Sequence, residues 1–170
     1  MRVVGYREFG NKLWNIVKFA LGNFPADFKP NANGIADCTQ HMSLADKWII
    51  CRLNEIVQNT NKSFNEYKFG DMVMGLHEFW KKELADVYLE AIKPVMKNGS
   101  EEQKTAALNC LYICLDTALK LLHPTMPYLT EELYQRLPHS PESSFDSIMI
   151  SAFPQHKDLP FNFGEIDADM

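Results

Sequence analysis

Residues 100–124, SEEQKTAALNCLYICLDTALKLLHP, contain a helix with a start signal at one end and a stop signal at the other. Ser100 is a favourable N-cap, and Gln103 stands three residues later, where it completes a capping box. Pro124 ends the helix, because proline has no backbone N–H to donate. The apolar side chains between them recur at helical spacing: Leu108, Leu111, Tyr112, Leu115, Leu119 and Leu122. Such a helix has to bury one side, which predicts packing against other helices.

The residues before position 100 predict three more helices of this kind. The first covers about 6–21, and its apolar side consists of Tyr6, Phe9, Leu13, Ile16, Val17 and Ala20. A polar loop over about 22–42 follows. Ser43 and Asp46 then form a variant capping box, and the second helix runs to Phe64. Its inward residues are expected to be Ile49, Leu53, Ile56, Val57 and Phe64.

A connector at 65–68 precedes a long third helix, which begins near Phe69. We expect Pro94, Asn98 and Gly99 to end it. Its apolar side is predicted at Phe69, Val73, Leu76, Trp80, Leu84, Val87 and Ala91.

The C-terminal part is less regular. Pro127 can begin a short fifth helix through about Leu137, and strand-like alternation is absent except over 147–153. We therefore predict an all-α fold, a helical bundle of about five helices, in one domain over residues 3–138. Residues 139–170 are expected to form an acidic, partly loose C-terminal extension, because residues 142–170 contain six acidic residues and only one basic residue, Lys157.

The charge is unevenly distributed. The 170 residues carry a net charge of -5, which by itself argues against a nucleic-acid partner. Residues 1–30, however, hold five basic and two acidic residues, whereas 31–170 hold twelve basic and twenty acidic ones. A basic first helix on an acidic body is compatible with a local RNA contact. No apolar run approaches the roughly 20 residues that span a bilayer, so no membrane is expected as a partner.

The four cysteines form no CxxC pair: Cys38, Cys51, Cys110 and Cys114. Cys110 and Cys114 are four apart on an apolar helix, where free, buried thiols are the favoured interpretation over a zinc site. The chain also lacks an apolar signal-peptide core near its start. We therefore expect a reducing, cytoplasmic location and no metal site.

Motifs for catalysis are absent from the sequence. It has no GxGxxG or GxxxxGK[ST] loop and no GxSxG turn. His77-Glu78 begins like a zinc-protease motif, but Lys81 stands where the second histidine should be. Glu83, Asp86 and Glu90 crowd one stretch of the third helix. Lys82 lies four residues before Asp86 and Lys93 three after Glu90, which favours salt bridges along a helix flank over acid–base catalysis. We predict no catalytic residue, metal ligand or cofactor in this chain.

One side of the first helix combines polar, basic and aromatic residues. At about 100° per residue, the side opposite the apolar one carries Arg7, Asn11, Trp14, Asn15 and Lys18. Cations neutralise phosphates, amides can read base edges, and flat rings stack on unpaired bases. The alternative is a solvated face with Trp14 lodged against a neighbour and the two asparagines tying down a loop. Lys12 follows Glu8 by four residues, the spacing of an ordinary surface ion pair.

Several segments together resemble one known family. They are GYR (5–7), NKLWN (11–15), KFAL (18–21), DKWI (46–49), RL (52–53), FNEYKF (64–69), FW (79–80), DVYLE (86–90), KP (93–94), LLHPTMP (121–127) and TEEL (130–133). Over about residues 3–154 the chain resembles the anticodon-binding domain of valyl-tRNA synthetases. The isoleucyl, leucyl and methionyl enzymes carry a related bundle, but NKLWN with DVYLE resembles the valyl type. Leu-Pro at 137–138 resembles the cytosolic eukaryotic enzymes.

The resemblance implies a five-helix bundle that docks the anticodon stem-loop of valine tRNA during translation. ATP and valine would be used by the catalytic domain of the same synthetase. That domain is expected as a partner, and its HIGH and KMSKS motifs are not in this sequence. HMSLA at 41–45 has only a chance likeness to KMSKS. The ligase activity would therefore lie outside this chain, and neither DNA nor a membrane is expected to bind it.

The resemblance also implies which residues face RNA, because the family uses the first helix and the loop after it. These positions are Asn11, Lys12, Asn15 and Lys18, to which the polar side described above adds Arg7 and Trp14. Phe24 or Phe28 of the loop could supply a further stacking ring. Arg52 is a weaker candidate, because an arginine there can also form an ion pair beside the core.

Two other functions remain open at this point. A helical bundle can keep its fold and serve as a protein-interaction module, since fold does not determine function, and the net charge of -5 favours that alternative. A positive groove along the first helix would favour RNA, and a uniformly negative surface would favour a protein. A small helical enzyme is the least favoured alternative, because no nucleophile–base or metal constellation is present.

Overall fold

The computed structural model describes residues 2–30, 35–139 and 147–155. Within these ranges the regular elements are all helical: α1 (Arg2–Asn23), the 3₁₀ helix η1 (Ala36–His41), α2 (Leu44–Asn65), α3 (Phe69–Glu78), the π-helix η2 (Phe79–Tyr88), α4 (Leu89–Asn98), α5 (Glu101–Leu122), α6 (Pro127–Arg136) and the 3₁₀ helix η3 (Ile148–Ile150). Because α3, η2 and α4 follow one another without a break, they form one long helix. The predicted all-α bundle of about five helices is confirmed.

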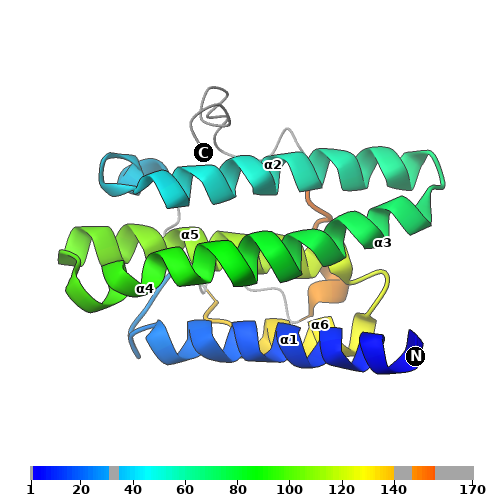
Figure 1. The fold of residues 1–170 in the computed structure, drawn as a ribbon, viewed down its shortest axis with the longest axis horizontal. Coiled ribbons are helices and arrows are strands. Elements are labelled where there is room, and N and C mark those ends of the chain that lie inside the picture. The colour runs from blue at the N-terminus through cyan, green and yellow to red at the C-terminus, as the bar shows by residue number, and fades with distance from the viewer. Residues whose placement is uncertain (1, 31–34, 140–146, 156–170) are drawn as a thin grey trace.

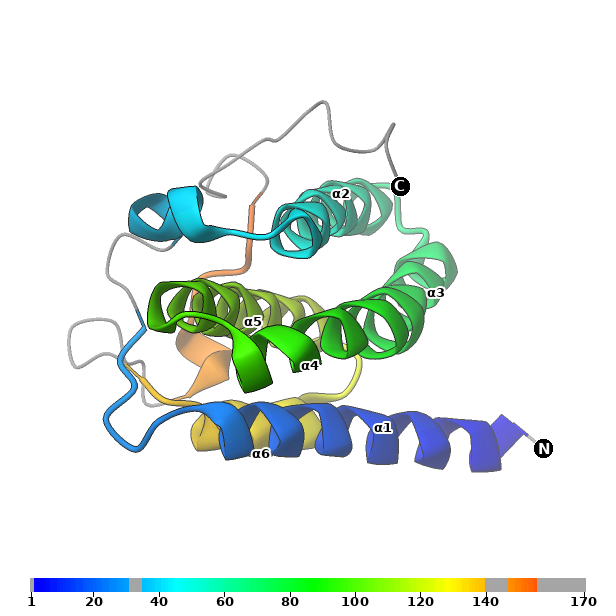
Figure 2. The ribbon, with the colours of Figure 1, turned by 60° about the vertical axis from the view of Figure 1, so that its left-hand side comes forward.

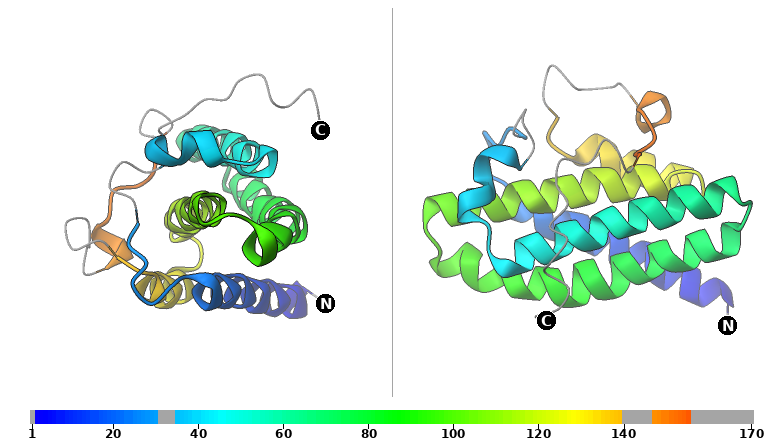
Figure 3. Two further views of the ribbon diagram at one scale, coloured as in Figure 1. Left: turned by 90° about the vertical axis from the view of Figure 1, so that its left-hand side faces the viewer. Right: turned by 90° about the horizontal axis from the view of Figure 1, so that it is seen from above.

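Helix α5 lies at the centre of the bundle. Seen end-on in the left view of Figure 3, it is surrounded by α2, by the long helix α3–η2–α4, and by a layer made of α1 and α6. Figure 1 shows that layer at the bottom, on the opposite side of α5 from α2. Most of the apolar side predicted for α5 is fully buried, while Tyr112 is only partly covered. Burial extends well beyond one side, because α5 is enclosed by other helices rather than lying on a surface.

Helix α5 is the most apolar long helix among the described residues that could span a membrane by its length. Its 22 residues are long and apolar enough to cross a membrane by length and composition alone. In this fold 72% of its most apolar window is buried inside the protein. That environment is the one expected for the core helix of a bundle, and a core helix meets the same criteria of length and hydropathy.

Both predicted capping boxes are present. At the start of α2, the backbone N–H of Ser43 donates to Asp46 Oδ2 at 2.8 Å, and the Ser43 Oγ accepts from the Asp46 N–H. At the start of α5, the Ser100 N–H donates to Gln103 Oε1 at 3.0 Å. Asp46 has a further role that sequence alone did not indicate. It is almost completely buried, and its Oδ1 accepts a hydrogen bond of 2.7 Å from the hydroxyl of Tyr88, which ties α2 to η2.

The predicted apolar side of the third helix is wrong in part. Phe69, Val73 and Val87 are 48%, 37% and 46% exposed, and Ala91 is exposed as well. The buried side instead consists of Met72, Leu76, Phe79, Trp80, Leu84, Tyr88, Leu89 and Ile92. For Val87 and Ala91 the physical reason is the π-helix, whose i→i+5 hydrogen bonds widen each turn, whereas Phe69 and Val73 precede it in α3. Wider turns keep residues four apart on one side, so Trp80, Leu84, Tyr88 and Ile92 are all buried.

The helix ends at Asn98 and Gly99 as predicted, and the prediction is wrong only for Pro94. Pro94 lies inside α4 and does not end it. Val95 and Met96 pack against the core after the proline, so side-chain burial there keeps the backbone helical despite the missing N–H. The helix ends at Gly99, where a Cβ would lie only 2.6 Å from the Val95 carbonyl oxygen. A close backbone contact therefore explains the glycine.

Two other expectations are corrected. Phe64, predicted to point inward, is 40% exposed and lies in an aromatic cluster with Phe69 and Phe153. Residues 147–153, which alternate like a strand, contain the 3₁₀ helix η3. Ile148 is buried and the carbonyl of Pro154 accepts a hydrogen bond from Asn61, so residues 147–155 lie against the bundle. The rest of the expected extension, 140–146 and 156–170, falls outside the described residues.

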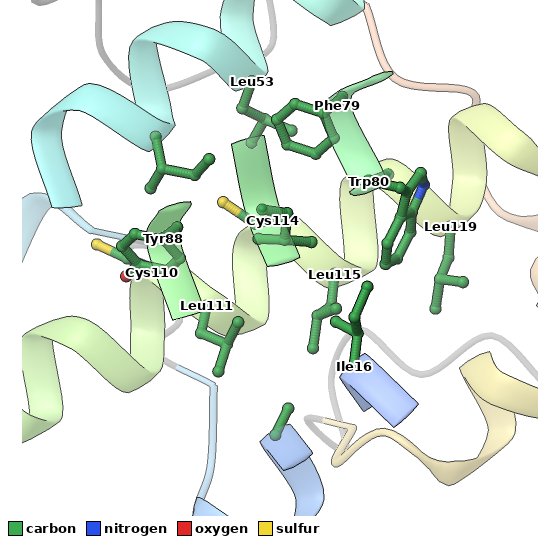
Figure 4. Packing of buried hydrophobic residues seen from close by; sticks show 14 of the residues in the cluster. Ile16, Leu53, Phe79, Trp80, Tyr88, Cys110, Leu111, Cys114, Leu115 and Leu119 are labelled. Atoms are coloured by element: carbon green, nitrogen blue, oxygen red, sulfur yellow. The ribbon is translucent and has the colours of Figure 1, made fainter. Parts of the chain in front are cut away.

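The core joins all layers of the bundle. Figure 4 shows Tyr88, Phe79 and Trp80 of η2 beside Cys110, Cys114 and the leucines of α5, with Ile16 of α1 completing the packing from the other side. All four cysteines are free and buried, which confirms the prediction for Cys110 and Cys114. Burial, with a smaller contribution from the charge of Asp46, raises the pKa of the Cys110 and Cys114 thiols well above the usual range. These thiols are therefore poor nucleophiles at neutral pH.

Candidate nucleic-acid interface

The polar side predicted for the first helix points away from the core. Arg7, Asn11, Trp14, Asn15 and Lys18 are all exposed on α1, and we call these five residues the α1 outer face. The opposite side of the same helix is buried at Phe9, Leu13, Ile16, Val17 and Ala20, as predicted. The side chain of Tyr6 falls outside the described part. Helical periodicity therefore placed these residues correctly, and packing on α5 and α6 explains why the outer face is left to solvent.

The two cations of the α1 outer face keep their charge unneutralised. In the part of the chain that the structure describes, neither Arg7 nor Lys18 has an ion-pair partner, although several other basic residues do. Within the same ranges, Asn11 and Asn15 donate no hydrogen bond to a loop, so they do not serve the structural role considered above. The face thus presents two cations and two amides to solvent.

Lys12 lies on the flank of α1 and has a different partner from the predicted one. Its Nζ contacts Asp86 Oδ1 of η2 at 2.7 Å, and not Glu8. The side chains of Lys12 and Asp86 are 30% and 58% exposed, so this ion pair contributes little to the free energy of unfolding. The ion pair connects α1 to η2, and the carboxylate of Asp86 partly neutralises the charge of Lys12.

Trp14 borders helix α6. Its ring is 37% exposed, and the guanidinium of Arg136 lies 5.0 Å from the ring centroid. Arg136 in turn donates two hydrogen bonds to Glu132 Oε1, one of them from Nε at 2.9 Å. The sequence alone does not indicate this contact of Arg136. Only its spacing of four residues from Glu132 was visible there, and nothing in that spacing indicates a contact with α1.

Arg52 lies in a different environment from the α1 outer face. Its Nη2 contacts Glu83 of η2 at 2.7 Å, and its Nη1 contacts Glu55 at 2.5 Å. The carboxylate of Glu83 is only 16% exposed. Arg52 thus forms the ion pair beside the core that was the alternative to an RNA contact, and it joins α2 to η2.

The loop aromatics considered for stacking pack on the protein. Phe24 and Phe28 stack on each other with ring centroids 4.5 Å apart, and both lie near the ring of Tyr112 of α5, at 6.4 and 6.1 Å. Each is only partly exposed. Their main contacts are therefore with α5 and with each other.

The acidic residues of η2 and α4 are engaged in ion pairs, but only the Glu90–Lys93 pair is the one that the spacing predicted, since Lys82 pairs with Glu78 and not with Asp86. Glu83 pairs with Arg52, Asp86 with Lys12, and Glu90 with Lys93 at 2.6 Å. Among the described residues, no group of three histidines, cysteines or acidic residues could hold a metal ion.

His77 of α3 packs beside α1. Its ring contacts Phe9 at a centroid distance of 4.5 Å. Partial burial, followed by the charges of Lys81 and Lys12, holds the pKa of His77 below its ordinary value.

Comparison with known proteins gives the family. Residues 46–169 match the model described as the anticodon-binding domain of tRNA ligase. The chain belongs to this family. It is also 46% identical over 154 residues to the valine–tRNA ligase of Schizosaccharomyces pombe, 40% over 167 residues to that of Homo sapiens, and 36% over 169 residues to that of Clostridium perfringens. The resemblance to the anticodon-binding domain of valyl-tRNA synthetases is thereby confirmed.

The extent of these matches limits what they say about the site. They cover 91%, 98% and 99% of this chain but only 16%, 13% and 18% of the relatives, so the chain spans about one sixth of their length. The family match begins at residue 46, after α1, whereas the alignment to the Homo sapiens protein includes almost the whole chain. Helix α1 therefore belongs to the region shared with valine–tRNA ligases, while the roles of its residues rest on geometry.

Proposed function

We propose that this domain docks the anticodon stem-loop of valine tRNA on the α1 outer face. One observation carries the proposal: Arg7 and Lys18 are exposed, have no ion-pair partner within the described ranges, and flank an exposed tryptophan and two exposed amides. Cations bind phosphates, amides can read base edges, and an aromatic ring can stack on an unpaired base, which is the combination that single-stranded RNA loops require. The family supports an anticodon as the ligand, and the names of the relatives support valine tRNA.

The proposal divides the work of a synthetase between this domain and a catalytic part. ATP and valine would be used by a catalytic domain of the same synthetase, and the present residues would only hold the tRNA. The relatives leave room for such a domain, since this chain spans 13–18% of their length. A cytoplasmic location is part of the same proposal and agrees with four free thiols.

Titration of the 170-residue chain with RNA stem-loops tests the proposal. A valine anticodon stem-loop and an unrelated stem-loop of equal length are added at low salt, and binding is followed by fluorescence anisotropy. We expect the valine stem-loop to bind more tightly, because the amides of Asn11 and Asn15 can discriminate between base edges, whereas phosphate contacts do not. Equal affinities for the two RNAs would contradict recognition of the anticodon, and no binding to either would contradict RNA docking altogether.

A protein partner is the second candidate function. It is favoured by the net charge of -5 and by exposed apolar side chains away from the α1 outer face, such as Tyr67 at 81% and Met74 at 73%. The same titration separates the two candidates, since a protein-interaction module gives no salt-sensitive RNA binding. Retention of binding to a valine stem-loop after Tyr67→Ala and Met74→Ala would favour RNA.

A further inference from the structure

Helix α6 lies directly beside α1 and shares its outward side. The two helices form one layer of the bundle in Figure 2 and in the left view of Figure 3. They approach closely at Gly10, where a Cβ would lie 3.5 Å from Leu129 of α6. Four residues further along α1, the guanidinium of Arg136 lies over the ring of Trp14. The surface next to the α1 outer face is therefore a flank of α6.

That flank contains three residues spaced four apart. Tyr128, Glu132 and Arg136 lie along one side of α6, since residues four apart in an α-helix lie one above the other. The Arg136 end is fixed in space by its contact with Trp14, so Tyr128 lies on the same side about two turns earlier. The core-facing side of α6 is a different one, formed by Thr130, Leu133 and Tyr134.

Tyr128 has no structural reason to be aromatic. It is 92% exposed, the highest value among the large hydrophobic side chains described, and so contributes almost nothing to the core. The carboxylate of Glu132 lies between Tyr128 and Arg136, but it accepts two hydrogen bonds from Arg136. The charge of this carboxylate is thus compensated locally, and the flank does not repel a polyanion in the way an unpaired acid would.

We propose that the RNA-binding surface extends onto α6, where Tyr128 supplies a second stacking ring for an unpaired base and Arg136 is a positioning residue for Trp14. The inference rests on the proposed function and adds a second helix to it. The occupant is a single-stranded RNA loop, since the layer joins the cations Arg7 and Lys18 to two exposed aromatic rings. Stacking on an exposed ring tolerates any base, so this contact adds affinity more than sequence preference.

The test uses the 170-residue chain and the valine anticodon stem-loop. Tyr128→Ala should weaken binding about tenfold, in line with the loss of one base–aromatic stack, and should leave the salt dependence unchanged because the ring carries no charge. Tyr128→Phe keeps the ring and should restore most of the affinity. Tyr67→Ala is the matched control, because Tyr67 is also strongly exposed, at 81%, but lies at the α2–α3 turn.

The role of Arg136 is tested by a double-mutant cycle with Trp14. Arg136→Met should weaken binding severalfold in the wild-type background and clearly less in the Trp14→Ala background, because a positioning residue acts through the ring. Equal effects in both backgrounds would overturn the positioning role. If Lys18→Ala weakens binding while Tyr128→Ala binds like the wild type, the α6 surface is wrong and the proposed function stands. If the wild-type chain binds no RNA, both are wrong.

Discussion

The α1 outer face and the surface where α2 meets η2 are both rich in charged side chains, but the charges are used differently. Arg52 forms ion pairs with Glu55 and Glu83, and the second of these pairs joins α2 to η2. Arg7 and Lys18 of the α1 outer face contact no carboxylate in the described ranges. A basic residue therefore indicates a binding surface only when the fold leaves its charge without a partner.

The same contrast applies to the neighbours of these cations. Beneath the α2–η2 surface lie buried groups such as Asp46 and Tyr88, which hydrogen-bond to each other. The α1 outer face lies over no such network, and its asparagines make no structural hydrogen bond among the described residues. Substitutions should therefore reduce stability at the first surface and RNA binding at the second.

The largest expected effect is a loss of stability, caused by a substitution beneath the α2–η2 surface. Asp46→Ala should lower the free energy of unfolding by about 3 kcal/mol, because it removes the cap of α2 and leaves the buried Tyr88 hydroxyl without its carboxylate. Urea denaturation measures the change. Asp71→Ala, which removes an exposed acid from the first turn of α3, is the control and should cost well under about 1 kcal/mol. A loss below about 1 kcal/mol for Asp46→Ala would contradict a structural role for this contact.

Arg52→Ala should have the next largest effect on stability. We expect the free energy of unfolding to fall by about 1–2 kcal/mol, because the partly buried Glu83 loses its partner. Affinity for the valine stem-loop should stay within about twofold of the wild type, which corresponds to less than about 0.5 kcal/mol. A loss of RNA affinity without a loss of stability would place Arg52 in the RNA site and break the comparison.

Trp14→Ala tests the opposite surface. It should weaken stem-loop binding about tenfold, as expected for one lost base–aromatic stack, while changing the free energy of unfolding by less than about 1 kcal/mol. Anisotropy titration and urea denaturation on the same protein sample separate the two effects. If stability falls and RNA affinity does not, the ring is a packing partner of Arg136 and nothing more.

The smallest effect concerns His77, on the flank between α1 and η2. Burial against Phe9 and the charges of Lys81 and Lys12 keep its pKa below 6.5 in the folded protein. The unfolded chain then binds the proton more readily, so the free energy of unfolding should decrease as the pH falls through about 6.5. An NMR titration of the imidazole should show the lowered pKa, and Lys81→Ala should move it back toward 6.5. A His77 pKa at or above 6.5 would contradict burial of the ring against Phe9 and the effect of the two lysines.

Local signals in the sequence were sufficient for much of this fold. Ser43 with Asp46 and Ser100 with Gln103 specify helix starts through hydrogen bonds to nearby residues, and the structure has both boxes. The α1 outer face also followed from periodicity, because α1 is a regular α-helix. These features depend on neighbours within one or two turns, which a sequence displays directly.

Features that depend on distant contacts were missed. The π-helix over Phe79–Tyr88 shifted the buried side of the long helix, and no local sequence pattern predicted its wider turns. Lys12 pairs with Asp86, 74 positions away, and not with the nearer Glu8. The contact between Trp14 and Arg136 joins helices from opposite ends of the chain. Such pairs form only when tertiary packing brings the helices together.

The central claim is that the unneutralised cations of the α1 outer face bind RNA phosphates, and the salt dependence of stem-loop binding tests it most directly. Affinity is measured over a series of salt concentrations for the wild-type chain, for Lys18→Ala, and for Lys82→Ala, whose lysine is exposed but paired with Glu78. We predict that Lys18→Ala weakens binding and flattens the slope of log affinity against log salt by about one unit, while Lys82→Ala keeps the wild-type slope. A wild-type slope for Lys18→Ala would contradict the account.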